Sequence, residues 1–195
     1  MALLLSLLMA LVICSCGPVG SLGCDLPQSQ GRLSRKTLVL LDQMRRISTS
    51  LCLEDRNDFR FPQEMVNGSQ LQKAQAVSVL HEMLQQIFNL FRTERSSAAW
   101  NPTLLVKLRA GLHLQLEHLE TCLQQVMVEE DSASAIKDPT LALRRYFWRI
   151  HLYLQEKNYS DCAWEIVRLE VMSSFSSSTN LQEKLRSKDG EPGSS

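Results

Sequence analysis

The chain has 195 residues, 44% of them hydrophobic, which is enough for one compact domain with a sizeable core. Its 21 basic residues balance its 21 acidic residues. A formal charge of zero gives no global attraction to nucleic acid or to an anionic membrane, so neither is expected as a partner.

The N-terminus has the pattern of a secretory signal peptide. Residues 2–14 are almost entirely apolar, but this run is too short to span a membrane. Ser21 and Gly23 are small residues three and one positions before Cys24, as signal peptidase requires. We expect residues 1–23 to be removed and the mature chain to be secreted. It contains no second apolar run that could insert into a membrane.

The first predicted helix of the mature chain covers residues 34–47. Apolar residues recur along it at helical spacing, and Ser34 is a suitable N-cap. Arg45 and Arg46 would lie in the last turn, where cations are favourable. Residues 48–68 break the helical period and are predicted to form a long connection.

Two further helices follow, with only the short link 96–100 between them. The first of the two is predicted over residues 69–92. The next begins at Asn101 and Pro102, an N-cap followed by proline at the first helical position. Gly111 inside this helix costs of order 1 kcal/mol relative to alanine, and we expect it to mark a close contact with another helix.

After a second polar break, Asp138 and Pro139 repeat the same start signal and predict a fourth helix. Residues 158–160 are predicted to form a tight turn into the last helix. Residues 189–195 have the composition of a disordered tail, which leaves residues 24–188 as one helical domain.

The start of the last helix, residues 162–175, carries a clear amphipathic pattern. Ile166 and Leu169 lie off its apolar stripe, and Arg168 and Met172 lie at the edge of that stripe. This second face is therefore available for contacts outside the core. The predicted core stripe itself comprises Trp164, Val167, Val171 and Phe175.

The lengths of the connections predict the topology. They alternate long, short, long, short along the chain. A short link forces its two helices to be antiparallel, whereas a long connection lets the second helix run parallel to the first. The result is an all-α fold of the helical-cytokine type. It is an up-up-down-down four-helix bundle with a fifth helix in the second crossover.

Four of the six cysteines belong to the predicted mature chain, and an even number in a secreted protein indicates two disulfides. In the predicted topology Cys24 and Cys122 lie at one end of the bundle, and Cys52 and Cys162 lie at the other. Helices of about 20 Å separate the two ends, whereas bonded cysteines have Cα atoms within about 7 Å. We therefore expect the pairs Cys24–Cys122 and Cys52–Cys162.

Several segments resemble the type I interferon family. Cys162-Ala163-Trp164-Glu165, followed by Val167-Arg168 and Met172, is similar to the C-terminal helix of that family. The resemblance extends over nearly the whole mature chain. Its other segments are residues 24–28, 52–64, 80–91, 96–100 and 178–182.

This resemblance implies a monomeric antiviral cytokine with no catalytic activity and no cofactor. Such a protein bridges two interferon-α/β receptor subunits and activates JAK-STAT signalling. By position in the family, the high-affinity subunit would contact Leu53, Arg56, Asp58, Arg168, Leu169, Met172 and Ser176. The low-affinity subunit would contact Phe88, Asn89, Leu104, Arg109, Arg144, Arg145 and Trp148.

The chain departs from interferon alpha within both predicted contact regions. Ser173 stands where interferon alpha has arginine, so one cationic contact to the high-affinity subunit is missing. Arg109 and His113 stand where interferon alpha has tyrosines, so contacts with the low-affinity subunit differ in detail.

Two other functions share part of the sequence pattern. A secreted helical hormone or growth factor, such as a reproductive signal, would show every residue pattern described above, and only the family resemblance disfavours it. A small secreted enzyme is disfavoured because no catalytic motif is present. The four histidines show no metal-ligand spacing, so no metal site is expected. Two Asn-x-Ser sequons, at Asn67 and Asn158, predict N-glycosylation in loops or turns.

Overall fold

The computed structural model describes residues 26–67, 71–129 and 140–189, and its regular structure within these ranges is helical throughout. In chain order the helices are α2 (Leu26–Gln43), the 3₁₀ helix η1 (Thr49–Asp55), α3 (Gln63–Asn67), α4 (Lys73–Phe91), α5 (Glu94–Ala99), α6 (Pro102–Glu129), α7 (Leu141–Glu156) and α8 (Asp161–Asp189).

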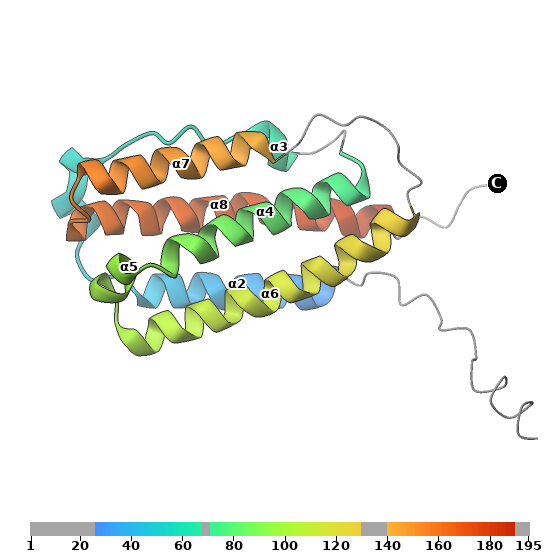
Figure 1. Cartoon of the computed structure of the whole chain (residues 1–195), viewed down its shortest axis with the longest axis horizontal. Helices are drawn as coiled ribbons and strands as arrows, with labels where there is room; N and C mark the ends of the chain where they lie inside the picture. The colour runs from blue at the N-terminus through green and yellow to red at the C-terminus, as the bar shows by residue number, and fades with distance from the viewer. Residues whose placement is uncertain (1–25, 68–70, 130–139, 190–195) are drawn as a thin grey trace, which may run out of the picture.

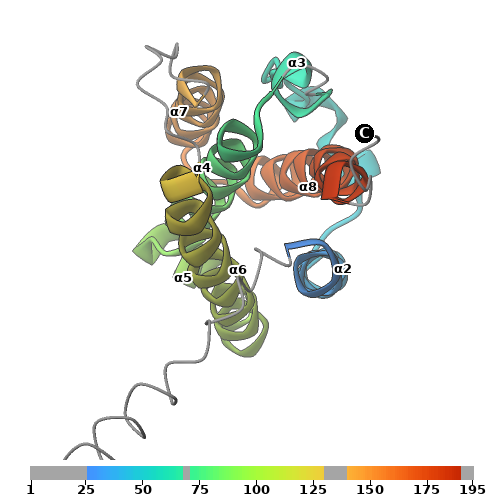
Figure 2. The ribbon, with the colours of Figure 1, turned by 90° about the vertical axis from the view of Figure 1, so that its right-hand side faces the viewer.

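The main bundle consists of α2, α4, α6 and α8. Figure 1 shows α2 and α4 running in one direction and α6 and α8 in the other, which confirms the up-up-down-down topology. α7, which precedes α8 in the chain, packs on α4 and α8. Seen end-on, α2 and α8 lie on one side of the bundle, and α4, α6 and α7 lie on the other (Figure 2).

α2 begins and ends earlier than its apolar pattern predicts. The predicted range of 34–47 and the predicted N-cap at Ser34 are both wrong, because Ser34 lies buried within α2. Its hydroxyl donates a hydrogen bond of 3.1 Å to Gln115 of α6. Much of the buried stripe of α2 is polar, so apolar spacing does not reveal where the helix starts. This stripe comprises Gln30, Ser34, Thr37 and Leu41.

The sequence predicts that Arg45 and Arg46 lie in the last turn of this helix. In the structure both residues instead follow the end of α2. The Arg46 guanidinium donates to the carbonyl of Ala99 and pairs with the Asp161 carboxylate at 3.0 Å. This arginine therefore connects the chain after α2 to the end of α5 and the start of α8.

The predicted connections contain short helices that the sequence pattern misses. The long connection over residues 48–68 includes η1 and α3. Much of the link 96–100 belongs to α5, whose N-cap Thr93 accepts a hydrogen bond of 3.1 Å from the Ser96 amide. α4 begins at Lys73, four residues after the predicted start.

The predicted start of the third main helix is confirmed. The Asn101 side-chain oxygen accepts hydrogen bonds from the amides of Thr103 and Leu104 at 3.0 and 3.2 Å. It thereby satisfies two of the donors that the start of α6 leaves without helical partners. The corresponding signal for α7, Asp138 and Pro139, lies outside the described residues.

α8 continues through the serine-rich stretch 173–178. The buried Ser174 hydroxyl donates to the Val171 carbonyl at 2.8 Å, and the buried Ser178 hydroxyl donates to the Phe175 carbonyl at 2.7 Å. These bonds satisfy the hydroxyl groups within the helix itself.

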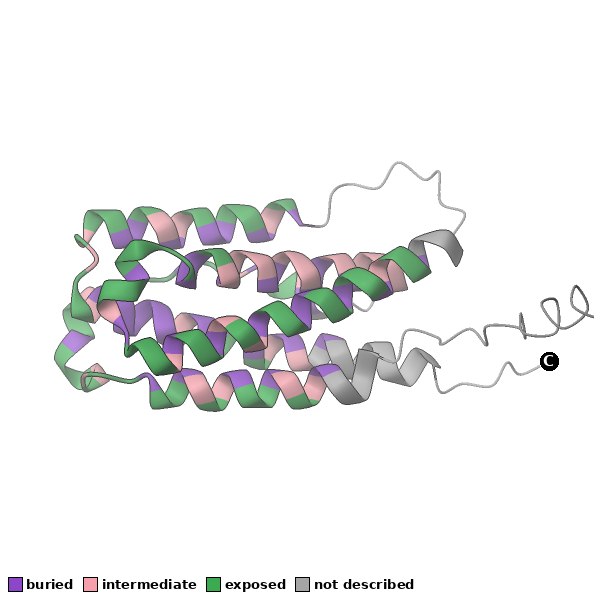
Figure 3. Ribbon diagram, turned by 60° about the horizontal axis from the view of Figure 1, so that its bottom comes forward, coloured by how far each residue is buried: buried purple, intermediate pink, exposed green. Residues whose placement is uncertain are grey.

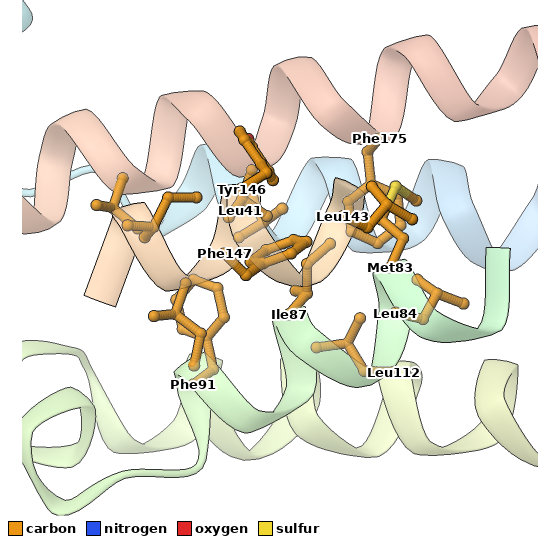
Figure 4. Close-up of a cluster of buried hydrophobic side chains, with 14 of the residues drawn as sticks. Leu41, Met83, Leu84, Ile87, Phe91, Leu112, Leu143, Tyr146, Phe147 and Phe175 are labelled. Carbon is orange, nitrogen blue, oxygen red and sulfur yellow. The ribbon is translucent and has the colours of Figure 1, made fainter. Parts of the chain in front are cut away.

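The core is formed where the long helices meet (Figure 4). The predicted stripe of α8 is buried in it, and so is Ile166, which the sequence pattern places off that stripe. Core side chains labelled in Figure 4 are Leu41, Met83, Leu84, Ile87, Phe91, Leu112, Leu143, Tyr146, Phe147 and Phe175.

Some predictions concern residues outside the described ranges, namely the signal peptide, Cys24 and the tail apart from Asp189. Cys122 is disulfide-bonded, and its predicted partner is Cys24. Among the helices that the structure describes, none combines the length and hydrophobicity needed to cross a membrane.

Candidate functional surfaces

A disulfide between Cys52 and Cys162 attaches η1 to the start of α8, as the topology predicts. The two Cα atoms lie 5.2 Å apart, although 110 positions separate the cysteines in the sequence. Leu53, the residue after the bridge, has 53% of its surface exposed. The bridge therefore holds an exposed apolar side chain next to α8.

Two side chains of α7, and that of Lys157 directly after it, hold the end of η1 and the loop that follows. The Tyr153 hydroxyl donates to the Asp55 carbonyl at 2.7 Å, and Lys157 pairs with the Asp55 carboxylate at 2.9 Å. Arg149 donates to the carbonyls of Phe59 and Arg60 at 2.9 and 3.1 Å. The backbone is thus held at the end of η1 and again at Phe59 and Arg60.

No sequence motif marks these three residues as functional. Arg149, Tyr153 and Lys157, which directly follows the last residue of α7, are spaced four residues apart, so they lie on one side of the helix. That spacing is the signal that could have indicated a shared partner. Within the loop that they hold, the side chains of Arg56 and Asp58 are exposed.

Arg168 lies in a different environment from the one predicted for it. Its side chain is only 2% exposed, so in this structure it is not available as a direct receptor contact. It forms a two-pronged ion pair with Glu165, whose side chain is 1% exposed, at 2.6 and 2.9 Å. A further nitrogen donates to the Leu41 carbonyl at 3.0 Å. The amphipathic pattern places Arg168 only at the edge of the stripe, and it does not reveal this pairing.

The remaining predicted contacts on α8 are accessible. Leu169 and Ser176 are exposed, and Met172 is half-buried (Figure 3 shows how burial varies around the helices). Ser173 is exposed among them. We define the loop–α8 surface as Leu53, Arg56, Asp58, Leu169, Met172 and Ser176.

Glu170 is a half-buried carboxylate of α8 that the sequence analysis does not single out. The Tyr146 hydroxyl donates to it at 2.8 Å. Burial raises the pKa of Glu170, and the negative charge of nearby Asp58 raises that pKa further. Burial and the neighbouring Glu170 charge also raise the pKa of Tyr146, which keeps its hydroxyl protonated as a donor.

The second predicted group of residues lies across α4, α6 and α7. Trp148 on α7 has 61% of its surface exposed, and Arg145 is also exposed. The Arg144 guanidinium donates to both carboxylate oxygens of Glu82 on α4, at 3.1 and 3.2 Å. This pair connects the parts of the surface that α7 and α4 contribute.

On the α6 side, Arg109 is fixed by the end of α4 and by α5. Its Nε donates to the Phe91 carbonyl at 2.7 Å, and one terminal nitrogen donates to Ser97 Oγ at 2.8 Å. His113 of α6 stacks on the Phe88 ring of α4 with centroids 6.2 Å apart. We define the α4–α6–α7 surface as Phe88, Asn89, Leu104, Arg109, Arg144, Arg145 and Trp148.

Comparison with known proteins identifies the family. A model of the interferon alpha/beta domain matches residues 26–185. The chain belongs to the type I interferon family. This interferon is 71% identical to interferon omega-1 of Homo sapiens over 195 residues, and the match covers all of both chains. It is 66% identical to interferon omega-2 of Equus caballus over 194 residues, again with complete coverage of both.

More distant relatives agree with this assignment. Interferon tau of Cervus elaphus is 61% identical over 191 residues, with 98% of each chain covered. Among solved structures, zebrafish interferon 2 is similar in fold, with a TM-score of 0.63 and 20% identity. That match covers 76% of this chain and 96% of the zebrafish chain.

The family resemblance predicted from the sequence is therefore confirmed, and this interferon is a cytokine. After Lys188 the chain has the extension Asp-Gly-Glu-Pro-Gly-Ser-Ser, which predicts similarity to the omega members of the family. The identities to the two omega relatives named above agree with this prediction. Members of the family are secreted cytokines that act through interferon receptors. Among the described residues, no group of three or more His, Cys, Asp or Glu side chains could hold a metal ion.

Proposed function

We propose that this interferon bridges two interferon-α/β receptor subunits and so activates JAK-STAT signalling and an antiviral response. The observation that supports this proposal is the presence of two separate surfaces on one bundle, each with exposed residues, such as Arg56 and Leu169 on one and Arg145 and Trp148 on the other. The loop–α8 surface would bind the high-affinity subunit, and the α4–α6–α7 surface would bind the low-affinity subunit. Bridging requires only binding, so no catalytic step is proposed.

A reporter assay tests this function directly. Cells carrying a STAT-dependent reporter are treated with the purified protein, with and without an antibody that blocks the high-affinity receptor subunit. We expect a response that the antibody abolishes. A full response in the presence of the blocking antibody would instead support a helical hormone that acts through another receptor.

Arg56 is the strongest candidate for direct contact with the high-affinity subunit. It is an exposed arginine in a loop held by α7, and a guanidinium can form two parallel hydrogen bonds with a partner carboxylate. We predict that Arg56→Ala weakens binding to that subunit by at least about 1 kcal/mol, with little change in stability. Surface plasmon resonance measures the affinity.

Lys107→Ala is the matched control for Arg56→Ala. Lys107 is also an exposed cation, but it lies on α6, away from the loop–α8 surface. The Lys107→Ala variant should bind the high-affinity subunit with unchanged affinity. If both variants weaken binding equally, the effect is one of overall charge and Arg56 is not a specific contact.

We also propose that residues 1–23 direct secretion and that the mature protein is a glycosylated monomer. Asn158 is exposed in the turn between α7 and α8, and Asn67 ends α3. N-terminal sequencing of protein secreted from mammalian cells should begin at Cys24. Loss of mass on Asn67→Gln or Asn158→Gln would identify the occupied sequon, and light scattering would test the monomer.

A further inference from the structure

The buried ion pair between Glu165 and Arg168 is unexpected in a helix whose neighbouring residues form the core. Removing two charges from water is costly, and replacing such a pair by apolar residues is often neutral or stabilising. The pair is therefore not explained by stability alone. Both residues belong to α8, one turn apart, and Arg168 reaches beyond Glu165 to other groups.

The guanidinium of Arg168 connects Glu165 to the loop–α8 surface. Its Nε and Nη2 are occupied by the two carboxylate oxygens, which fixes the plane of the group. Its Nη1 then lies 3.0 Å from the Leu41 carbonyl near the end of α2 and 3.0 Å from the Met172 sulfur. Arg168 thus contacts Met172, which belongs to the loop–α8 surface and is half-buried.

Holding Met172 in place would favour binding. Methionine has three rotatable side-chain bonds, and ordering such a side chain at an interface costs free energy at the moment of binding. If Arg168 already restricts Met172 in the free protein, part of that cost is met before the receptor arrives.

We propose that Glu165 is a positioning residue for receptor binding, which it supports through Arg168 and Met172 without itself touching the receptor. The inference rests on the proposed function, because it assumes that the loop–α8 surface binds the high-affinity subunit. It differs from the expectation that Arg168 contacts the receptor directly. In that case, freeing Arg168 from Glu165 would leave binding unchanged or strengthen it.

The two possibilities predict opposite effects of Glu165→Gln, which removes the charge with little change in shape. We expect this variant to bind the high-affinity ectodomain roughly five- to tenfold more weakly and the low-affinity ectodomain as the wild type does. Surface plasmon resonance against each isolated ectodomain measures both. Unchanged or tighter binding to the high-affinity ectodomain would overturn the proposal, as would an equal loss for both ectodomains.

A double-mutant cycle tests the route through Met172. If Glu165 acts through this side chain, Glu165→Gln should weaken binding by less than about twofold in a Met172→Ala background. Full additivity of the two substitutions would mean that Glu165 acts by another route, and the proposal would be wrong. Failure of the wild type to bind either ectodomain would count against the proposed function instead.

Two further variants separate positioning from general destabilisation. Ser34→Ala removes a different buried hydrogen bond, between α2 and α6, and should leave both affinities unchanged. Glu165→Leu combined with Arg168→Leu removes both charges and should therefore remain folded. We expect this double variant to lose affinity for the high-affinity ectodomain alone, and wild-type affinity in a folded double variant would refute the role.

Discussion

At the scale of single residues, Gly111 occupies a position in α6 where the structure has room for a side chain. A Cβ atom built there would lie 3.8 Å from Thr37 Oγ1, which is an ordinary contact distance. Glycine in a helix interior destabilises the folded protein by roughly 0.5–1 kcal/mol relative to alanine. We therefore predict that Gly111→Ala stabilises the protein by about that amount, measured by denaturant unfolding. Destabilisation would show that α2 and α6 pack more closely than this distance indicates.

Glu170 should make stability depend on pH. Burial raises its pKa above the ordinary value of 4.5, so the folded protein binds this proton more tightly than the unfolded chain. Its contribution to stability is therefore fully present below pH 4.5 and is lost as the pH rises through the folded-state pKa. A glutamine at this position carries no charge and can still accept the Tyr146 hydrogen bond.

We predict that Glu170→Gln is more stable than the wild type at pH 7 and that this advantage shrinks as the pH falls to 4.5. Thermal unfolding of both proteins across this pH range measures the difference, and the comparison cancels the titration of all other groups. A stability difference that does not change with pH would mean that Glu170 titrates normally.

Some of these residue environments could not be predicted from the sequence, because they depend on partners distant in the chain. Ser34 resembles an N-cap until Gln115 of α6 is placed opposite it. Arg168 resembles a surface contact until the α2 carbonyl of Leu41 is placed beside it. Trp164 was predictable as a core residue because helical spacing alone puts it on the buried face of α8.

At the scale of elements, the attachment of η1 to α8 depends on one covalent bond. Cys52 and Cys162 are 110 residues apart, and a cross-link that closes so long a loop is worth about 5 kcal/mol in the chain-entropy model. We predict that the Cys52→Ser, Cys162→Ser double variant loses about this much free energy of unfolding, measured with denaturant.

The same variant should also lose affinity for the high-affinity receptor subunit, because Leu53 follows the bridge directly. The loop beyond η1 should remain partly ordered, since Arg149 of α7 still donates to the carbonyls of Phe59 and Arg60. Hydrogen exchange can compare the two segments. Equal loss of protection in η1 and in residues 56–60 would show that the α7 contacts cannot hold the loop without the disulfide.

The length of a helix explains whether it could be predicted from the sequence. Long helices such as α4 and α6 contain several turns of apolar spacing, and Asn101 adds an N-cap to the second of them. η1, α3 and α5 have seven, five and six residues, too few for a periodic pattern. Helices this short are stable only through tertiary contacts, which no local sequence pattern records.

At the scale of the whole molecule, the topology was predictable because the lengths of the connections constrain it, and the cysteine pairing that it implies can be checked against the structure. The short link at α5 makes α4 and α6 antiparallel, and the long connection before α4 lets it run parallel to α2. The Cys52–Cys162 bond agrees with this arrangement. The topology also separates the α8 part of the loop–α8 surface from the α4–α6–α7 surface, because α8 lies on one side of the bundle and α4, α6 and α7 lie on the other (Figure 2).

This separation predicts that substitutions on the two surfaces act independently. Substitutions at distant sites without shared partners are usually additive. Trp148 is largely exposed, so Trp148→Ala should leave the fold intact and should weaken binding to the low-affinity subunit alone. In the double variant of Trp148→Ala and Arg56→Ala, the affinity for each receptor subunit should change by the same factor as in the corresponding single variant.

The signalling consequence of Trp148→Ala follows from bridging. The variant should still occupy the high-affinity subunit but recruit the second subunit poorly, so it should compete with the wild type while giving a weaker STAT response. Receptor binding and reporter output measured on the same cells test this prediction. Full signalling despite reduced affinity for the low-affinity ectodomain would mean that the second subunit binds elsewhere on the bundle. The α4–α6–α7 surface would then have no role in bridging.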